Sequence, residues 1–246
     1  MHILFNINYL TKNNIFKSVK VTLTILCINF LLIRSAQAQQ NTFKQPYDGL
    51  FYGGLMVFSA TDYLLTQKLN AVPHHWEIAP IDKIAVSSLN SNIAHAADVT
   101  AGATIAATAA ITFMMPKTDR FGYMNLLTQN IWMTGNSVQL VKILVQRSRP
   151  YTNSAAYQNL GNKDDNYSFF SGHSAITASA ATTALLYAFR NSQSNAIRYT
   201  ASGAGVLALT TATLRILAGK HYPSDVITGI LFGTGVSLLN WQLRGL

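Results

Sequence analysis

The stretch Arg215-Ile-Leu-Ala-Gly-Lys-His-Tyr-Pro-Ser-Asp225 joins two apolar segments of helical length, Tyr199–Leu217 and Val226–Leu239. It places a guanidinium, an imidazole and a carboxylate close together in the chain. A carboxylate beside an imidazole orients the ring and makes it more nucleophilic, and a guanidinium can bind two oxygens of a phosphate group. The stretch therefore predicts two helices joined by a turn that binds an anion, provided that the rest of the chain supplies further cations and an acid.

The composition of the 246-residue chain indicates a membrane protein or a very apolar helical protein. Charged residues make up 11% of the chain and hydrophobic residues 49%, with a mean hydropathy of +0.20. Soluble domains carry about 25% charged residues. The net charge is +9, but the basic residues are scattered, so we expect no nucleic-acid partner.

Residues 1–38 have the pattern of a secretory signal peptide. Three lysines precede the apolar run Val21–Ile33, and the small-x-small sequence Ala36-Gln37-Ala38 follows it. The basic region is long for a cleaved signal, so an uncleaved signal anchor is the alternative. The only cysteine, Cys27, lies in the apolar run, so the mature chain would have neither disulfides nor cysteine-bound metal sites.

The rest of the chain indicates an all-α bundle of about six helices, embedded in a membrane. After a lead-in at 39–89, which includes the apolar segment Leu50–Leu69, the helical segments are Ile93–Met115, Phe121–Gln146, Ser174–Phe189, Tyr199–Leu217 and Val226–Leu239. Several approach the ~20 residues that cross a bilayer, and Gly229 and Gly233 form a small-xxx-small pair for close helix packing. A soluble, alanine-rich bundle is the competing fold, because Thr, Ser and Asn are frequent.

Basic residues indicate which ends of the bundle face the cytoplasm. The positive-inside rule places there the turns and the C-terminus that carry Lys117, Arg120, Arg190, Arg198 and Arg244. The turns 150–170 and 220–224 would then face outward. A cleaved signal also leaves the mature N-terminus outside. We therefore expect that Leu50–Leu69 does not cross but lies against the outer face of the bundle or along the interface, as Asp62 and Lys68 suggest.

Two further polar clusters fall at the same predicted end of the bundle as the turn 220–224. Lys142 and Arg149 are seven apart on a helical pattern that Pro150 ends, so both cations should point the same way. Ser171-Gly172-His173 begins the next helix, where a serine N-cap and free amides form an anion site. Each residue alone has a structural explanation, such as a snorkelling side chain or an ion pair between Arg215 and Asp225.

Together, Lys142-x6-Arg149-Pro150, Ser171-Gly172-His173 and Arg215-x5-His221-x3-Asp225 resemble the three signature motifs of the type 2 phosphatidic acid phosphatase (PAP2) and vanadium haloperoxidase superfamily. The resemblance covers about residues 90–246, which we expect to form a PAP2-like domain. Two positions depart from the family pattern. Phe170 stands where the family has proline and Leu214 where it has serine, which bears on the loop shape and the substrate more than on the chemistry.

The resemblance implies a phosphatase that works through a phosphohistidine. His221 would attack phosphorus, Asp225 would hold its ring in the right tautomer, and His173 would protonate the leaving oxygen and then activate water. The phosphoryl oxygens would be bound by the side chains of Lys142, Arg149, Arg215 and Ser171 and by the amide of Gly172. Because three cations can replace a divalent metal and no acidic cluster is apparent in the sequence, we expect activity without a metal or other cofactor.

The leading interpretation is an envelope phosphatase whose site faces away from the cytoplasm. Its substrate would be a lipid phosphate or pyrophosphate, such as phosphatidic acid, phosphatidylglycerol phosphate, undecaprenyl pyrophosphate or a lipid A phosphate. The alternatives are a soluble periplasmic acid phosphatase of broad specificity, a vanadium-dependent haloperoxidase, and a helical membrane protein without activity.

Other polar residues receive structural interpretations. We expect His74 and His75 at the surface or the membrane interface. His95 and Asp98, at positions i and i+3 of a helix, are interpreted as internal packing or as a hydrogen bond behind the site. Asp164 and Asp165 should be solvated in the outward loop.

Overall fold

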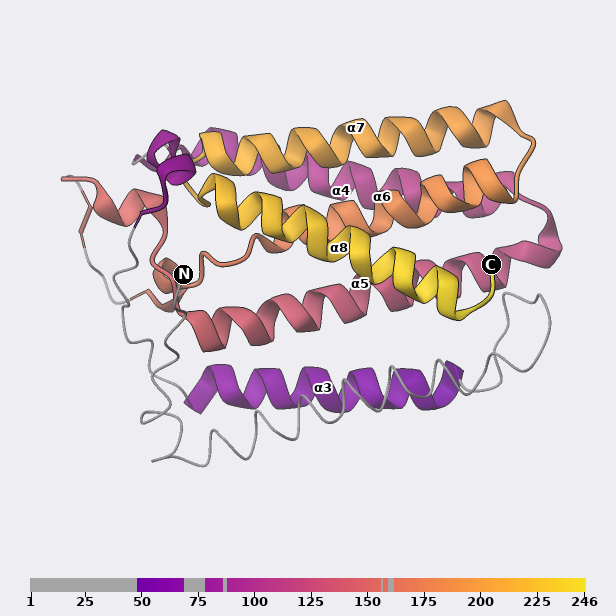
Figure 1. Ribbon diagram of the computed structural model, residues 1–246, viewed down its shortest axis with the longest axis horizontal. Coiled ribbons are helices and arrows are strands. Elements are labelled where there is room, and N and C mark those ends of the chain that lie inside the picture. The colour runs from indigo at the N-terminus through magenta and orange to yellow at the C-terminus, as the bar shows by residue number, and fades with distance from the viewer. Residues whose placement is uncertain (1–47, 69–77, 86–87, 156, 159–161) are drawn as a thin grey trace.

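The computed structural model describes residues 48–68, 78–85, 88–155, 157–158 and 162–246. Its six long helices run side by side (Figure 1): α3 (Asp48–Lys68), α4 (Ser91–Met114), α5 (Lys117–Val145), α6 (Gly172–Arg190), α7 (Asn195–Leu217) and α8 (Pro223–Leu243). No strand occurs in these residues, which confirms the predicted all-α bundle of about six helices. The expected signal at 1–38, Cys27, His74 and His75 lie outside the described residues.

Successive helices run up and down, so the connections gather at two ends. At one end, which we call the loop end, α3, α5 and α7 finish and α4, α6 and α8 begin, with α4 packed on α7 and α6 on both α7 and α8 (Figure 1). Three short 3-10 helices lie in the loops here: η2 (Pro80–Ile84), η3 (Pro150–Asn153) and η4 (Lys163–Asn166). Because α4 packs closely on α7, it belongs to the same bundle as the later helices.

Side-chain caps mark where the helices start. The Asn90 side chain accepts a hydrogen bond from the amide of Ile93 at 3.1 Å, and Ser194 caps α7 in the same way. The turn that we expected at 116–120 is shorter than predicted. Pro116 is itself the N-cap residue of α5, so Lys117 and Arg120 lie in the first turn of that helix.

Two glycines let α6 and α8 approach each other closely. A Cβ atom on Gly229 would lie 2.7 Å from the carbonyl oxygen of Ser171, and one on Gly233 would lie 2.0 Å from that of Ala175. Any side chain at these positions would therefore push the helices apart. The close packing predicted from the small-xxx-small pair is confirmed, and it brings the start of α8 against the start of α6.

The first described helix, α3, lies lengthwise against α5 rather than along an interface (Figure 1). Polar side chains join the two helices at three levels: Tyr52 donates to Asn125 at 2.6 Å, Ser59 donates to Asn136 at 2.9 Å, and Gln139 donates to Thr66 at 3.1 Å. Because residue numbers rise together along both helices, α3 and α5 are parallel. The expectation that 50–69 does not cross together with the other helices is wrong, because α3 runs from one end of the bundle to the other alongside α5.

Exposed charge, among the described residues, is confined to the ends of the bundle. Within the described residues, the exposed charged side chains are those of Lys83, Asp98 and Asp164 at the loop end and of Lys117 and Arg190 at the opposite end. Between the ends, exposed hydroxyls turn back onto their own helix, as when Thr210 donates to the Val206 carbonyl at 2.9 Å. The helices α4, α7 and α8 are each long and apolar enough to cross a membrane.

We expect Gly233→Ala to lower the melting temperature of the detergent-solubilised protein, because its new methyl group would overlap the Ala175 carbonyl. Overpacking of this kind costs about 1–3 kcal/mol. Gly235→Ala is the matched control on the same helix, because its Cβ would meet no atom within 4 Å. It should be neutral or more stable by up to about 1 kcal/mol. Equal melting temperatures for the two variants would contradict the close packing of α6 and α8.

Candidate active site

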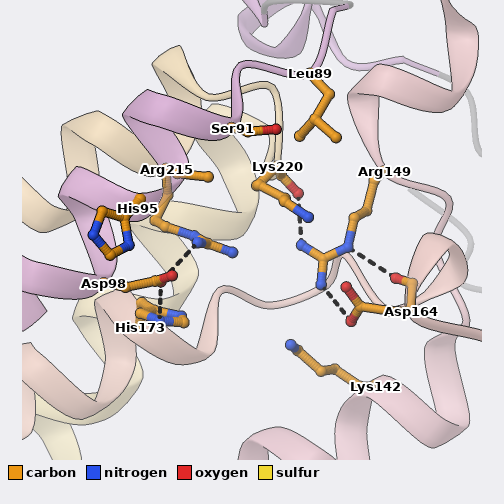
Figure 2. Close-up of a pocket in the computed structure, with 11 residues that line it drawn as sticks. Leu89, Ser91, His95, Asp98, Lys142, Arg149, Asp164, His173, Arg215 and Lys220 are labelled. Carbon is orange, nitrogen blue, oxygen red and sulfur yellow. Dashed lines mark hydrogen bonds and ion pairs between the residues drawn. The ribbon is translucent and has the colours of Figure 1, made fainter.

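A cavity of ≈ 470 Å³ opens at the loop end of the bundle. Four residues predicted to form the site line it: Lys142, Arg149, His173 and Arg215 (Figure 2). They come from the end of α5, the loop after it, the start of α6 and the end of α7. The structure thus brings together cations and an imidazole from three motifs that lie far apart in the sequence.

Arg149 reaches the cavity by a route that the sequence did not predict. The helix α5 ends at Val145, where Gln146 adopts a left-handed conformation with φ of 47°. Lys142 and Arg149 therefore do not share a helix face, as their spacing of seven suggested. Arg149 lies in the returning loop instead, and its guanidinium donates to the Lys220 carbonyl at 3.0 Å. It also lies 3.3 Å from Nε2 of His221.

His221 lies behind Arg149 and is almost completely buried, with 1% of its surface exposed. Its Nδ1 is 2.8 Å from the carbonyl oxygen of Ser168, which can only accept, so Nδ1 carries the proton. Nε2 then presents its lone pair to the guanidinium of Arg149. Burial and the nearby cations hold the pKa of His221 well below its ordinary value, so the ring is neutral.

Asp225 acts on His221 less directly than expected. Its Oδ2 lies 3.8 Å from Nδ1, which is an ion-pair distance and not a hydrogen bond. Oδ2 instead accepts from the Ser168 hydroxyl at 2.5 Å and from the Tyr222 amide at 2.9 Å. The carboxylate therefore fixes Ser168, and the Ser168 carbonyl fixes the tautomer of His221.

Arg147 lies between two buried carboxylates beneath this arrangement. It donates to Asp225 at 2.6 Å and to Asp82 at 2.8 Å. Asp82 belongs to η2 and also accepts from the hydroxyl and the amide of Ser224 at the start of α8. Neither Arg147 nor Asp82 was predicted from the sequence to belong to the site. The only signal was an acid in a short amphipathic connection, and nothing in the sequence linked it to an arginine 65 residues later.

Ser171 is the N-cap of α6, as predicted. Its hydroxyl accepts from the amide of Ser174 at 3.4 Å, and its side chain is completely buried. A Cβ atom on Gly172 would lie 3.3 Å from the Val138 side chain and 3.9 Å from Nζ of Lys142, so the start of α6 lies close to this cation. The first turn of α6 thus joins Lys142 and His173 at one wall of the cavity.

His173 is paired with Asp98, a residue that we expected behind the site. The Asp98 carboxylate is 55% exposed in the cavity and lies 2.9 Å from Nε2 of His173 (Figure 2). It also accepts from Arg215 at 3.4 Å. The alternative ion pair between Arg215 and Asp225 does not form, because each of these residues has another partner.

The acidic loop also departs from expectation, because neither aspartate is simply solvated. Asp164 accepts from Arg149 at 2.7 Å and lines the cavity. Burial alone would raise the pKa of Asp164. The positive charges of Arg149 and the nearby lysines outweigh burial, so this pKa lies below its ordinary value. Asp165 is buried and accepts from the hydroxyls of Tyr151 at 2.5 Å and Tyr157 at 2.6 Å.

Two further lining residues, Ser91 and Lys220, were missed, and His95, expected in internal packing or behind the site, lines the cavity instead. Lys220 could have been suspected, since it immediately precedes His221, whereas Ser91 and His95 come from a helix outside the motifs. Among the described residues, no three His, Cys, Asp or Glu side chains group closely enough to hold a metal ion. The chemistry that this arrangement offers is therefore that of an anion held by cations beside a neutral imidazole.

We expect Arg147→Met to destabilise the protein by about 3–5 kcal/mol, because it leaves the buried carboxylates of Asp82 and Asp225 without their cation. Thermal and chemical unfolding would measure the loss. Arg190→Met is the control, because Arg190 is exposed at the opposite end, and it should change stability by less than about 0.5 kcal/mol. A loss no greater than that of the control would show that the two carboxylates do not depend on Arg147.

Comparison with protein-family models matches residues 120–245 to the PAP2 superfamily. The match runs from the first turn of α5 to the end of α8 and includes all three motifs. No curated protein and no solved structure matches the chain significantly.

Proposed function

The chain belongs to the PAP2 superfamily, and we propose that it is an envelope phosphatase that removes a phosphate group from a lipid phosphate or pyrophosphate. One observation carries this proposal. The neutral, buried ring of His221 directs its lone pair toward the guanidinium of Arg149, which lines a cavity together with Lys142 and Arg215. A nucleophile beside three cations suits a phosphoryl group, whose oxygens would bind the cations while phosphorus faces the ring.

His221 attacks phosphorus through Nε2. In the structure this lone pair accepts from Arg149. A bound phosphoryl group gives the guanidinium stronger, charged acceptors, which releases the lone pair for attack. The proton on Nδ1 stays with the Ser168 carbonyl, and Asp225 stabilises the cationic phosphohistidine through Ser168.

His173 is the general acid and then the general base. As the bond from Nε2 of His221 to phosphorus forms, the ester oxygen leaves with its electron pair and takes a proton from His173. Water then gives a proton back to His173 and attacks the phosphohistidine, which releases phosphate and restores His221. Burial and the charge of Arg215 lower the pKa of His173 to about 4 in the empty cavity, and Asp98, 2.9 Å away, opposes this shift. The negative charge of a bound phosphoryl group raises the pKa of His173, so we propose that the ring takes up its proton together with the substrate.

The cations and the start of α6 stabilise the charge of the transition state. Lys142, Arg149 and Arg215 face the position of the phosphoryl oxygens, and the Gly172 amide and the Ser171 hydroxyl lie at the helix N-terminus beside them. Fixed cations of this kind supply the stabilisation that Mg²⁺ supplies in other phosphoryl-transfer enzymes. We therefore propose that activity requires no divalent metal.

The surroundings of the cavity favour an amphiphilic substrate. The cavity lies where α4 and α7, two helices apolar enough to cross a membrane, reach the loop end. Leu89, Val99 and Leu217 are exposed near it. A lipid could place its phosphate among the cations while its chains remain beside these apolar side chains. The flanks of the bundle carry no exposed charge among the described residues, which disfavours the alternative of a soluble phosphatase.

The distribution of basic residues supports an orientation in which the cavity faces away from the cytoplasm. The end opposite the cavity carries Lys117, Arg120, Arg190, Arg198 and Arg244. The acidic residues described there are Asp48 and Asp119. Of the basic side chains described at the loop end, Lys83 is exposed and the others line the cavity or lie beneath it, whereas Lys117 and Arg190 are both exposed at the opposite end. Exposed basic residues are typical of the cytoplasmic side.

We expect His221→Ala to abolish phosphate release from a panel of lipid phosphates and pyrophosphates presented in detergent to the membrane fraction. His173→Ala should lower turnover of every substrate, because it also removes the base that activates water, but the loss should be smaller for substrates with good leaving groups, which need the acid less. Wild-type activity should survive chelation of divalent metals. Turnover by His221→Ala, with the melting temperature unchanged, would reject the nucleophile, and loss on chelation that Mg²⁺ restores would reject metal independence.

Orientation can be measured with single cysteines in a chain whose Cys27 is replaced by serine. Lys83→Cys at the loop end should react with a membrane-impermeant maleimide in intact cells. Gln193→Cys, exposed in the turn between α6 and α7, should react only after the membrane is opened. The reverse pattern would place the cavity on the cytoplasmic side.

A further inference from the structure

The cavity contains four cations, and only two of them are neutralised. Arg149 pairs with Asp164, and Arg215 pairs with Asp98. In the part of the chain that the structure describes, Lys142 and Lys220 form no ion pair with a carboxylate. Their side chains approach the guanidinium of Arg149 from opposite sides (Figure 2). Burial and the neighbouring Arg149 lower the pKa of Lys142 to about 7 and lower that of Lys220 as well, so both ammonium groups gain from an anion bound beside them. Two lysines without a carboxylate partner therefore lie at two separate places in the cavity.

Lys220 is held in place by the phosphoryl-binding residues themselves. Its amide donates to the Arg215 carbonyl at 3.2 Å, and its own carbonyl accepts from Arg149 at 3.0 Å. Gly219 has a φ of 71°, which favours glycine and lets the chain turn into this position. The ammonium lies 5.2 Å from the centre of the Tyr151 ring, which is itself buried. Lys220 is thus a positioned cation, unlike a mobile surface lysine.

The reacting phosphoryl group does not require Lys220. The three motif cations already surround the cavity in front of His221, and Lys142 lies on the wall formed by the start of α6. Lys220 faces the same cavity from the other side of Arg149 (Figure 2). Ser91, in the first turn of α4, lines the cavity as well and offers a hydroxyl.

We propose that Lys220 binds a second phosphoryl group, so that the preferred substrate is a diphosphate monoester and not a monophosphate. This inference rests on the proposed phosphatase function and deepens it. The terminal phosphoryl group lies among Lys142, Arg149 and Arg215, and the inner one lies against Lys220. A diphosphate matches two separated centres of positive charge, whereas a single phosphate can occupy only one of them.

The reaction follows the course proposed above, with a phosphate as the leaving group. His221 forms a bond from Nε2 to the terminal phosphorus, and the bond from that phosphorus to the bridging oxygen breaks. The bridging oxygen keeps the electron pair and takes the proton of His173. Lys220 stabilises the charge on the departing monophosphate ester, and water then releases inorganic phosphate from His221.

The test compares farnesyl diphosphate with farnesyl monophosphate, which share the same apolar chain, in detergent with the full-length protein. Lys220→Met keeps the length of the side chain and removes its charge. It should lower kcat/KM for the diphosphate about tenfold or more, the loss expected for one charge-assisted contact. The value for the monophosphate should change less than about threefold. Lys220→Arg should restore most of the activity toward the diphosphate.

Lys83→Met is the control, because Lys83 is exposed at the same end but does not line the cavity. It should leave both substrates unaffected. Equal losses on both substrates in Lys220→Met, or no loss on either, would overturn the assignment of Lys220. A wild type that hydrolyses only the monophosphate would overturn the diphosphate preference and leave the phosphatase function standing. Activity of His221→Ala on either substrate would instead overturn the function itself.

Discussion

Arg147 lies between the carboxylates of Asp82 and Asp225, and this one buried guanidinium connects three distant parts of the chain. It joins the loop before α4, the end of α5 and the start of α8. Through Asp225 it also reaches Ser168, whose carbonyl sets the tautomer of His221. The tautomer of the proposed nucleophile thus depends on an ion pair whose residues do not line the cavity. An arginine suits this position because its planar fork can satisfy two acids at once.

A second constraint comes from the flanks of the bundle, which carry no exposed charge among the described residues. Charge is therefore concentrated at the ends, and at the loop end most of it is basic and turned inward. Asp164 and Asp98 relieve the repulsion in the empty cavity by pairing with Arg149 and Arg215. These carboxylates occupy the cations that a phosphate would use. Substrate binding is then an exchange of one anion for another, which costs less than creating an ion pair in a dry site.

The helices and the motif residues could be predicted from the sequence because both are local signals. Apolar length predicted α4 to α8 closely, and the resemblance of the three motifs to those of the PAP2 family identified Lys142, Arg149, His173, Arg215 and His221 as parts of one site. The partners of these residues could not be predicted. Asp82 and Asp98 come from segments outside the motifs, and their contacts span 65 to 142 residues. The left-handed residue Gln146 ends α5 before Arg149, and no glycine or proline at this position indicates the turn in the sequence.

The parallel packing of α3 on α5 has a consequence for the path of the whole chain. Asp48, at the start of α3, forms an ion pair with Arg244, beyond the end of α8, at 2.7 Å. The six long helices α3 to α8 run the length of the bundle in alternating directions, and six is an even number. Residue 48 and the C-terminus therefore lie at the same end of the bundle, and the cavity lies at the opposite end. If the bundle crosses a bilayer, a cavity outside the cytoplasm requires the chain to enter α3 from the cytoplasm. Cleavage after Ala38 would deliver it from outside. The compartment that holds the C-terminus therefore decides which side of the membrane the cavity faces and whether the signal at residues 1–38 is cleaved.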